Sequence, residues 1–158
     1  LGDDIIRNAR PCIKQLIDIY NRYQCSVIAV EEVPHEKVSS YGIINGRMLE
    51  DALYRVDDII EKPDVDKAPS DLGAIGRYIF TPQIFDCLKE TEEGIGNEVQ
   101  LTDAIRLLKD RQNIYGYLFK GKRYDTGDRF GYIEAIIDFA LENDRLGPQL
   151  SRYLQSLR

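Results

Sequence analysis

Two acidic clusters, more than a hundred residues apart, carry side chains that can hold a divalent metal ion. One is Gly2-Asp3-Asp4, and the other is Tyr124-Asp125-Thr126-Gly127-Asp128. Each is expected at the end of a strand, where a glycine beside an aspartate lets the backbone turn sharply. Mg²⁺ prefers a few carboxylate oxygens, with water and phosphate oxygens completing its octahedron. The alternative is that these aspartates form turns and cap helices.

A second group combines a carboxylate and an ammonium in Glu61-Lys62-Pro63. Proline restricts the residue before it to extended geometry, so Lys62 is expected to be extended and to point away from Glu61. The carboxylate can accept hydrogen bonds from sugar hydroxyls, and the ammonium can neutralise a phosphate as a point charge. The alternative is a solvated charge pair at a strand end.

Glycines and a basic stretch are two further candidates for ligand contacts. Gly42, Gly73 and Gly76 fall in or beside predicted strands, where glycine marks either a close approach to a ligand or a bulge. Residues 120–123 form a short basic patch, which is either a solvated loop or a region that attracts phosphate. The sequence contains neither a GxxxxGK[ST] loop nor a GxGxxG loop to cradle phosphates.

These residues must be positioned by alternating strands and helices. Hydrophobic periodicity predicts helices over residues 11–23, 82–89, 101–110, 131–142 and 146–157. Strands are predicted over residues 26–33, 38–44, 56–60, 73–80 and 114–120, with a loop over 63–72, another over 91–97 and a turn over 123–128. Asn45-Gly46 is a strong hairpin signal between the second and third strands. Residues 1–4 are interpreted as the end of a strand followed by a turn. The order predicts an α/β fold with a mixed, mostly parallel sheet.

Composition excludes several classes of function. The 158 residues carry a net charge of −6, which argues against nucleic acid or an anionic membrane as a partner. No apolar run approaches the roughly 20 residues of a membrane span. Three widely spaced cysteines indicate buried thiols in a reducing, cytoplasmic setting rather than disulfides. A single histidine, His35, argues against zinc and against Ser/His or Cys/His catalysis.

Taken in order, these motifs resemble the bacterial UTP–glucose-1-phosphate uridylyltransferases (UDP-glucose pyrophosphorylases), within the sugar nucleotidylyltransferase superfamily. The matching segments are Leu1-Gly2-Asp3-Asp4, Tyr41-Gly42-Ile43, Ile60-Glu61-Lys62-Pro63, and residues 68–72, 76–80, 96–104 and 120–128. The resemblance implies a Rossmann-like nucleotide-diphospho-sugar transferase sheet. Residues 1–145 would be its C-terminal, sugar-phosphate-binding portion, and residues 146–158 a terminal helix available for an oligomer contact.

The resemblance also implies residue roles. Asp3 and Asp125 would hold Mg²⁺, Lys62 would contact the phosphate of glucose 1-phosphate, and Glu61 with the backbone at Gly42 would hold glucose hydroxyls. The reaction implied is attack of the sugar-phosphate oxygen on the α-phosphorus of UTP, which gives UDP-glucose and pyrophosphate. Such transfer depends on positioning and charge neutralisation and needs no nucleophilic side chain.

This sequence departs from the family in one respect: the Gly-rich loop, the lysine that grips UTP and the base-reading segments of the N-terminal half are missing. We therefore interpret the chain as a fragment, expect it to be inactive alone, and expect self-association through an exposed sheet edge. Two alternatives remain open. One is a related sugar-1-phosphate thymidylyl- or adenylyltransferase, and the other is a non-catalytic sugar-nucleotide-binding or oligomerisation module.

Overall fold

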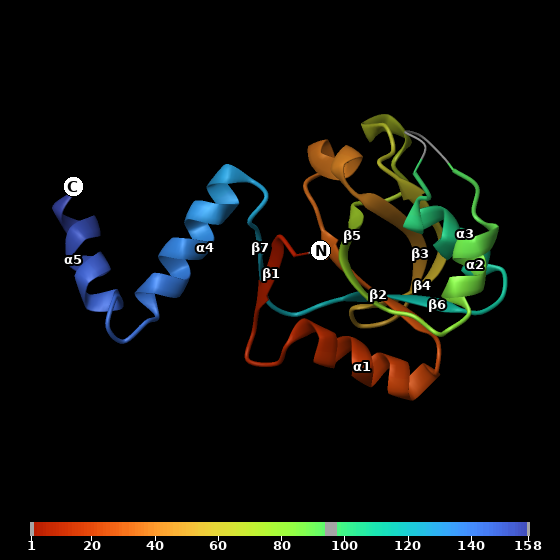
Figure 1. The fold of residues 1–158 in the computed structure, drawn as a ribbon, viewed down its shortest axis with the longest axis horizontal. Helices are drawn as coiled ribbons and strands as arrows, with labels where there is room; N and C mark the ends of the chain where they lie inside the picture. Colours follow the sequence, from red (N-terminus) through yellow and green to blue (C-terminus); the bar gives the residue numbers. More distant parts are fainter. Residues whose placement is uncertain (1, 94–97, 158) are drawn as a thin grey trace. The chain divides into compact units, whose positions relative to one another are not determined.

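The chain folds into two compact units in the computed structural model, which describes residues 2–93 and 98–157 (Figure 1). The first unit combines Leu1–Arg7 with Gly121–Arg158, and the second is Asn8–Lys120. Leu1 of the opening motif and residues 94–97, which include part of the predicted loop 91–97 and of the 96–104 motif, lie outside the described residues. Each unit is treated by itself below.

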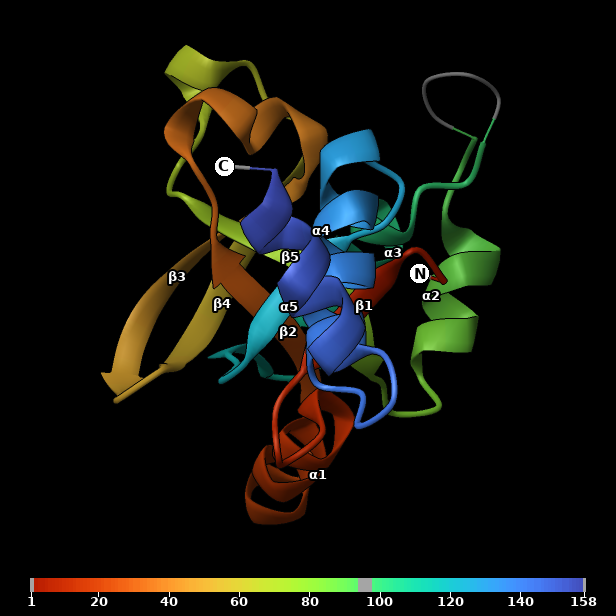
Figure 2. The same ribbon diagram turned by 90° about the vertical axis from the view of Figure 1, so that its left-hand side faces the viewer.

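A closed five-stranded sheet forms the centre of the second unit, in the order β2-β5-β3-β4-β6 with β6 pairing back to β2. The strands are β2 (Ser26–Glu32), β3 (Gly42–Glu50), β4 (Leu53–Glu61), β5 (Leu72–Ile79) and β6 (Ile114–Leu118). β3 and β4 form a long hairpin (Figure 2). Short 3₁₀ helices, η1 (His35–Ser40) and η2 (Val65–Lys67), lie in the connections that flank this hairpin.

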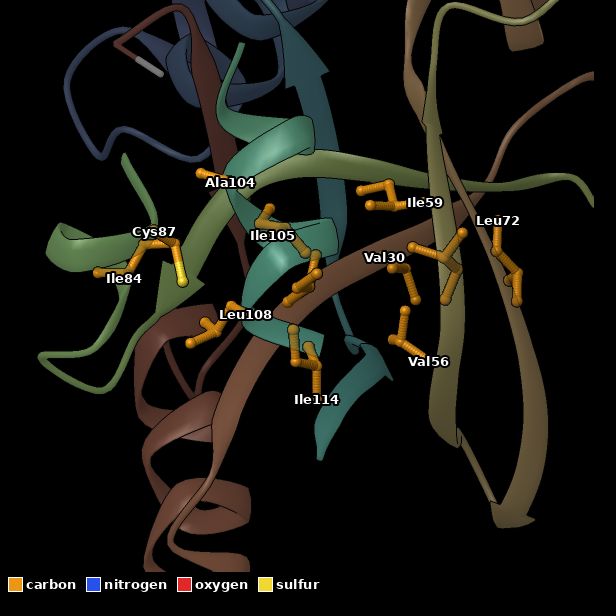
Figure 3. Packing of buried hydrophobic residues seen from close by; sticks show 12 residues of the cluster. Val30, Val56, Ile59, Leu72, Ile84, Cys87, Ala104, Ile105, Leu108 and Ile114 are labelled. Carbon is orange, nitrogen blue, oxygen red and sulfur yellow. The ribbon is translucent and has the colours of Figure 1, made fainter. Parts of the chain in front are cut away.

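Three α-helices accompany this sheet: α1 (Cys12–Tyr23), α2 (Ile84–Glu90) and α3 (Leu101–Lys109). α3 presents Ala104, Ile105 and Leu108 at helical spacing, and all three are fully buried. They belong to the same hydrophobic cluster as Val30 and Ile59 of the sheet (Figure 3). Each large aliphatic side chain buried in this way stabilises the unit by about 1.5–3 kcal/mol relative to an exposed one. This packing fixes the start of α3 against β4.

The hairpin turn predicted at Asn45-Gly46 is wrong. Both residues lie inside β3, where the register with β4 shifts, and the chain reverses after Glu50, where Ala52 has a φ of 61°. A Cβ on Gly46 would lie 2.6 Å from the Arg55 carbonyl oxygen. This glycine therefore permits a close approach of two strands at a bulge rather than a turn.

The first unit contains a two-stranded antiparallel sheet and two helices. Its elements are β1 (Asp4–Arg7), β7 (Lys122–Asp125), α4 (Arg129–Leu141) and α5 (Gly147–Ser156). The turn predicted over residues 123–128 is wrong for its first half, because β7 pairs with β1 in the register Asp4↔Asp125 to Arg7↔Lys122. Likewise Asp4 begins a strand, whereas residues 1–4 were expected to end one. Both strands have only four residues and contain charged side chains, so their sequences show no alternation of apolar and polar residues. For this reason the sequence did not predict them.

The mixed α/β class is confirmed, but the sheet is not mostly parallel within this chain. Among the described residues only β2 and β6 pair in parallel, and the other strand pairs are antiparallel. The short β3–β4 connection can only join antiparallel neighbours. β5 then lies between β2 and β3 and is antiparallel to both.

The assignment of residues 1–145 to a C-terminal, sugar-phosphate-binding portion stays a prediction. α5 packs on α4 within the first unit, and a role of residues 146–158 in an oligomer contact stays a prediction. No helix in the part of the chain that the structure describes is long and apolar enough to cross a membrane.

Candidate functional site

The side chains of Asp3 and Asp125 lie together in the first unit. Asp3 directly precedes β1 and Asp125 ends β7, and the β1–β7 register sets these two strand ends side by side. A Cβ built on Gly127 would lie 3.2 Å from Asp125 Oδ1 and 3.2 Å from Asp3 Oδ2. The two oxygens are therefore separated by no more than twice that distance, so both carboxylates border one small region of the first unit.

Backbone hydrogen bonds fix this acidic pair. The amide and the hydroxyl of Thr126 both donate to the Asp3 carbonyl oxygen, at 2.8 and 2.7 Å. Asp125 Oδ1 accepts from the amides of Gly127 and Asp128, at 3.1 and 3.3 Å. Asp128 itself caps α4, because its carboxylate accepts from the amides of Phe130 and Gly131. For Asp128 the helix-cap alternative is thus confirmed.

The other acidic and basic residues of these segments are held in ion pairs. Asp4 is 5% exposed and pairs with the buried guanidinium of Arg123, which also lies 3.5 Å from Asp125 Oδ2. Removing one partner of such a buried pair costs about 3–5 kcal/mol. Lys122 of the basic patch bonds Asp138 on α4 at 2.6 Å, and this hydrogen bond raises the pKa of the Lys122 ammonium. Both basic residues therefore stabilise the unit.

The donor chemistry of Asp3 and Asp125 fits Mg²⁺. Both are hard oxygen ligands at accessible positions, and Mg²⁺ is commonly bound through one or two carboxylates plus substrate phosphates. Within residues 2–93 and 98–157, no cluster of three or more His, Cys, Asp and Glu side chains is placed to hold a metal.

Gly42 and Glu61 face each other across the β3–β4 pair in the second unit. Gly42 is buried, and a Cβ built on it would lie 3.2 Å from Glu61 Oε2, 3.0 Å from Thr102 Cγ2 and 3.5 Å from Ile59 Cδ1. The absence of a side chain therefore lets the Gly42 backbone lie close to the Glu61 carboxylate, which is about one-third exposed. β3 and β4 keep their register at Gly42, so the bulge interpretation does not apply there, and contact of Gly42 with a ligand stays a prediction.

Lys62 differs from its predicted geometry. Its φ is 43°, in the left-handed region, so the expectation of an extended residue before Pro63 is wrong. The Lys62 amide donates to the Tyr41 carbonyl oxygen at 2.9 Å, which holds the chain in this tight exit from β4. As a result Lys62 Nζ lies 3.8 Å from Glu61 Oε1, instead of pointing away from it. A left-handed conformation in a residue other than glycine costs about 1–3 kcal/mol and concentrates at functional sites.

The predicted site residues therefore form two groups, one in each unit. Asp3 and Asp125 come together, and so do Gly42, Glu61 and Lys62. The assignment of catalytic and binding roles to these five residues stays a prediction.

Sequence reasoning missed two residues in these groups. Thr102 lies in the quoted motif over residues 96–104, but nothing in the pattern showed that its side chain reaches Gly42. Arg123 was grouped with a basic patch, although the aspartate that neutralises it is distant in sequence. Contacts across such separations have no local sequence signal.

Comparison with known proteins confirms the resemblance drawn from the motifs. A UTP–glucose-1-phosphate uridylyltransferase of Streptococcus pyogenes is 48% identical over 163 aligned residues, which cover 99% of this chain and 53% of that protein. A crystal structure of a UDP-glucose pyrophosphorylase complexed with UDP-glucose matches with a TM-score of 0.85 and 47% identity, over 90% of this chain and 55% of that one. A UTP-bound UGPase from Acinetobacter baumannii matches with a TM-score of 0.87 and 32% identity, over 100% and 55% of the two chains.

The chain spans about half the length of the curated relatives it matches. The structural matches confirm a mixed α/β fold of the nucleotidyltransferase type. The family model described as nucleotidyl transferase matches residues 1–141 and so includes both groups of site residues. On this evidence the chain belongs to the nucleotidyl transferase family.

Proposed function

We propose that this chain is the sugar-phosphate-binding part of a UTP–glucose-1-phosphate uridylyltransferase. In the reaction, a phosphate oxygen of glucose 1-phosphate attacks the α-phosphorus of UTP. The bond to the departing phosphate breaks, and UDP-glucose and pyrophosphate are released. The names of the relatives at 47–48% identity support this choice of substrates.

One observation carries the proposal within the structure: the Glu61 carboxylate and the Lys62 ammonium lie 3.8 Å apart, and the Gly42 backbone lies close to the carboxylate. A hexose phosphate presents hydroxyl donors next to a dianion. Glu61 accepts from the hydroxyls, and Lys62 neutralises the phosphate, which keeps the attacking oxygen in place. A free carboxylate with no cation beside it would repel the same ligand.

The acidic pair supports the same chemistry from the first unit. Asp3 and Asp125 would hold Mg²⁺, which when bound neutralises charge that develops on the phosphates. The backbone contacts from Thr126, Gly127 and Asp128 keep both carboxylates in position without a ligand. No side chain in this scheme forms a covalent intermediate.

Calorimetric titration of the 158-residue chain with UDP-glucose, in the presence of Mg²⁺, tests the proposal. We expect saturable binding, and glucose 1-phosphate should compete for it. Glu61→Gln and Lys62→Met should each weaken it about tenfold, since hydrogen bonds to charged groups contribute about 1.5–3 kcal/mol. The control is Lys89→Met on α2, which removes a comparable exposed ion pair with Asp86 and should leave binding unchanged. No binding by the wild-type chain, or equal losses in all three variants, would contradict the proposal.

Compartment and assembly are part of the same proposal. The three cysteines are free, which supports a reducing, cytoplasmic setting. Self-association is supported by α4, where Phe130, Tyr132, Ile133 and Ile136 are each more than half exposed. An apolar patch of this kind is typical of a protein–protein contact.

A further inference from the structure

Thr126 holds the backbone of Asp3 with two hydrogen bonds. Its amide donates to the Asp3 carbonyl oxygen at 2.8 Å, and its hydroxyl donates to the same oxygen at 2.7 Å. A carbonyl oxygen has two lone pairs, and here both are used by one residue. Asp3 lies just before β1, beyond the last pair of the β1–β7 ladder, which is Asp4↔Asp125. The position of Asp3 therefore depends on Thr126 rather than on the ladder.

The two carboxylates of the acidic pair are held in different ways. Asp125 Oδ1 accepts hydrogen bonds from the amides of Gly127 and Asp128. Among the residues that the structure describes, none donates a hydrogen bond to the Asp3 carboxylate. That carboxylate nevertheless lies beside Gly127, where a Cβ would be 3.2 Å from Asp3 Oδ2. Its place there is set through its own backbone, and Thr126 is what fixes this backbone.

Such backbone control matters for a metal ligand. If the Asp3 carbonyl is held less firmly, the peptide group that follows it can rotate, and the carboxylate moves relative to that of Asp125. Mg²⁺ requires near-ideal octahedral geometry with ligand bonds of about 2.0–2.1 Å, so it tolerates little displacement of a ligand. Groups that orient metal ligands without contacting the metal typically change its affinity by about 10- to 100-fold.

We propose that Thr126 is a positioning residue whose hydroxyl keeps Asp3 where it can bind Mg²⁺ together with Asp125. The inference rests on the proposed function, because it concerns the metal proposed for that reaction. The hydroxyl does not itself contact the metal. Since the Thr126 amide still holds the Asp3 carbonyl when the hydroxyl is removed, the expected effect is smaller than that of losing both bonds.

The test compares Thr126→Val, which replaces the hydroxyl by a methyl of similar size, with Thr126→Ser, which keeps it. Mg²⁺ alone is titrated into each isotopically labelled 158-residue chain, and the amide resonances of Asp3, Asp125 and Gly127 report binding. We expect Thr126→Val to bind Mg²⁺ roughly two- to tenfold more weakly than wild type, because one neutral hydrogen bond is lost. Thr126→Ser should bind nearly as tightly as wild type.

Thr91→Val is the matched control. Thr91 Oγ1 donates to the Cys87 carbonyl oxygen at 2.8 Å, so this substitution removes the same kind of hydrogen bond in the second unit. It should lower the thermal unfolding midpoint, as Thr126→Val does, and leave Mg²⁺ binding unchanged. A further variant, Gly127→Ala, places a methyl 3.2 Å from an oxygen of each carboxylate. It should weaken Mg²⁺ binding by displacing the pair itself.

Three results would overturn the inference alone. Thr126→Val binds Mg²⁺ as tightly as wild type, or Thr126→Ser loses as much affinity as Thr126→Val, or Thr91→Val loses as much. If Gly127→Ala alone binds weakly, the carboxylates bind the metal without help from the hydroxyl. A wild-type chain whose Asp3 and Asp125 resonances do not respond to Mg²⁺ contradicts the metal role in the proposed function, and the inference with it.

Discussion

Gly42→Ala tests whether the Glu61 carboxylate, which lies beside Gly42, binds the ligand. The new methyl lies 3.0 Å from Thr102 Cγ2 and 3.2 Å from Glu61 Oε2, so the Glu61 carboxylate must move by a few tenths of an ångström. Overpacking costs about 1–3 kcal/mol, and the flexible end of Glu61 places this case at the lower limit. Because the φ of Gly42 is not positive, alanine fits the backbone and recovers about 0.4–1 kcal/mol through the unfolded chain. The free energy of unfolding should therefore change by no more than about 1 kcal/mol.

Binding should respond far more than stability. The methyl displaces the Glu61 carboxylate, which in the proposed function accepts a hydrogen bond from a sugar hydroxyl. Loss of a hydrogen bond to a charged group, about 1.5–3 kcal/mol, corresponds to roughly 10- to 150-fold weaker binding of UDP-glucose. Urea unfolding and calorimetric titration of the same protein samples measure the two effects.

Gly73→Ala is the matched control. Its Cβ would meet Val33 Cγ1 at 3.0 Å, a contact as tight as that of Gly42→Ala. Gly73 pairs with Ile43, the neighbour of Gly42, so its side chain points to the opposite face of the sheet. It should reduce stability to a similar extent and leave binding unchanged. Binding by Gly42→Ala within twofold of wild type, or equal losses in both variants, would refute the assignment.

Three further predictions concern backbone strain, pH and assembly. Lys62→Gly should be about 1 kcal/mol more stable to urea than Lys62→Ala, since only glycine adopts a φ of 43° without cost, while both lose UDP-glucose binding; equal stabilities would contradict the strain. Hydrogen bonds from Lys122 and then Tyr124 lower the pKa of Asp138, so its stabilisation is present above the unfolded pKa of about 3.9 and is lost as pH falls through the folded value. Urea unfolding at pH 7 and near pH 3 should therefore show a smaller acid loss in Asp138→Asn than in wild type, and an unchanged loss would argue against this pairing. Light scattering at tens of micromolar should show a mass above one chain that Ile136→Lys reduces; a monomeric wild type would count against self-association.

Much of the second unit was predictable from local sequence. Periodicity located α1, α3, β2 and β6 to within one or two residues, because each buries a continuous apolar stretch or stripe. The Asn45-Gly46 turn failed for a tertiary reason. Glycine was needed there to let the Arg55 carbonyl approach, and the sequence signal for a close approach is the same as that for a turn.

The sequence predicted which residues belong to the candidate site, but it predicted their geometry less well. Asp3 and Asp125 were paired correctly, although the strand that joins them, β7, was missed. The contact between Lys62 and Glu61 reversed the local expectation, because the hydrogen bond to Tyr41 overrides the preference of a residue before proline. Thr102 lies 60 positions from Gly42, and only the packing of α3 shows that the two meet.

The central claim is that Glu61 and Lys62 bind the sugar phosphate, and chemical-shift mapping tests it most directly. Amide resonances of the isotopically labelled 158-residue chain are recorded while UDP-glucose is added in the presence of Mg²⁺. Glu61→Gln combined with Lys62→Met serves as the control that removes both proposed contacts. The account predicts saturable shifts of the Gly42, Glu61 and Lys62 resonances that the double variant loses. Shifts confined to other residues, or equal shifts in the double variant, would contradict it.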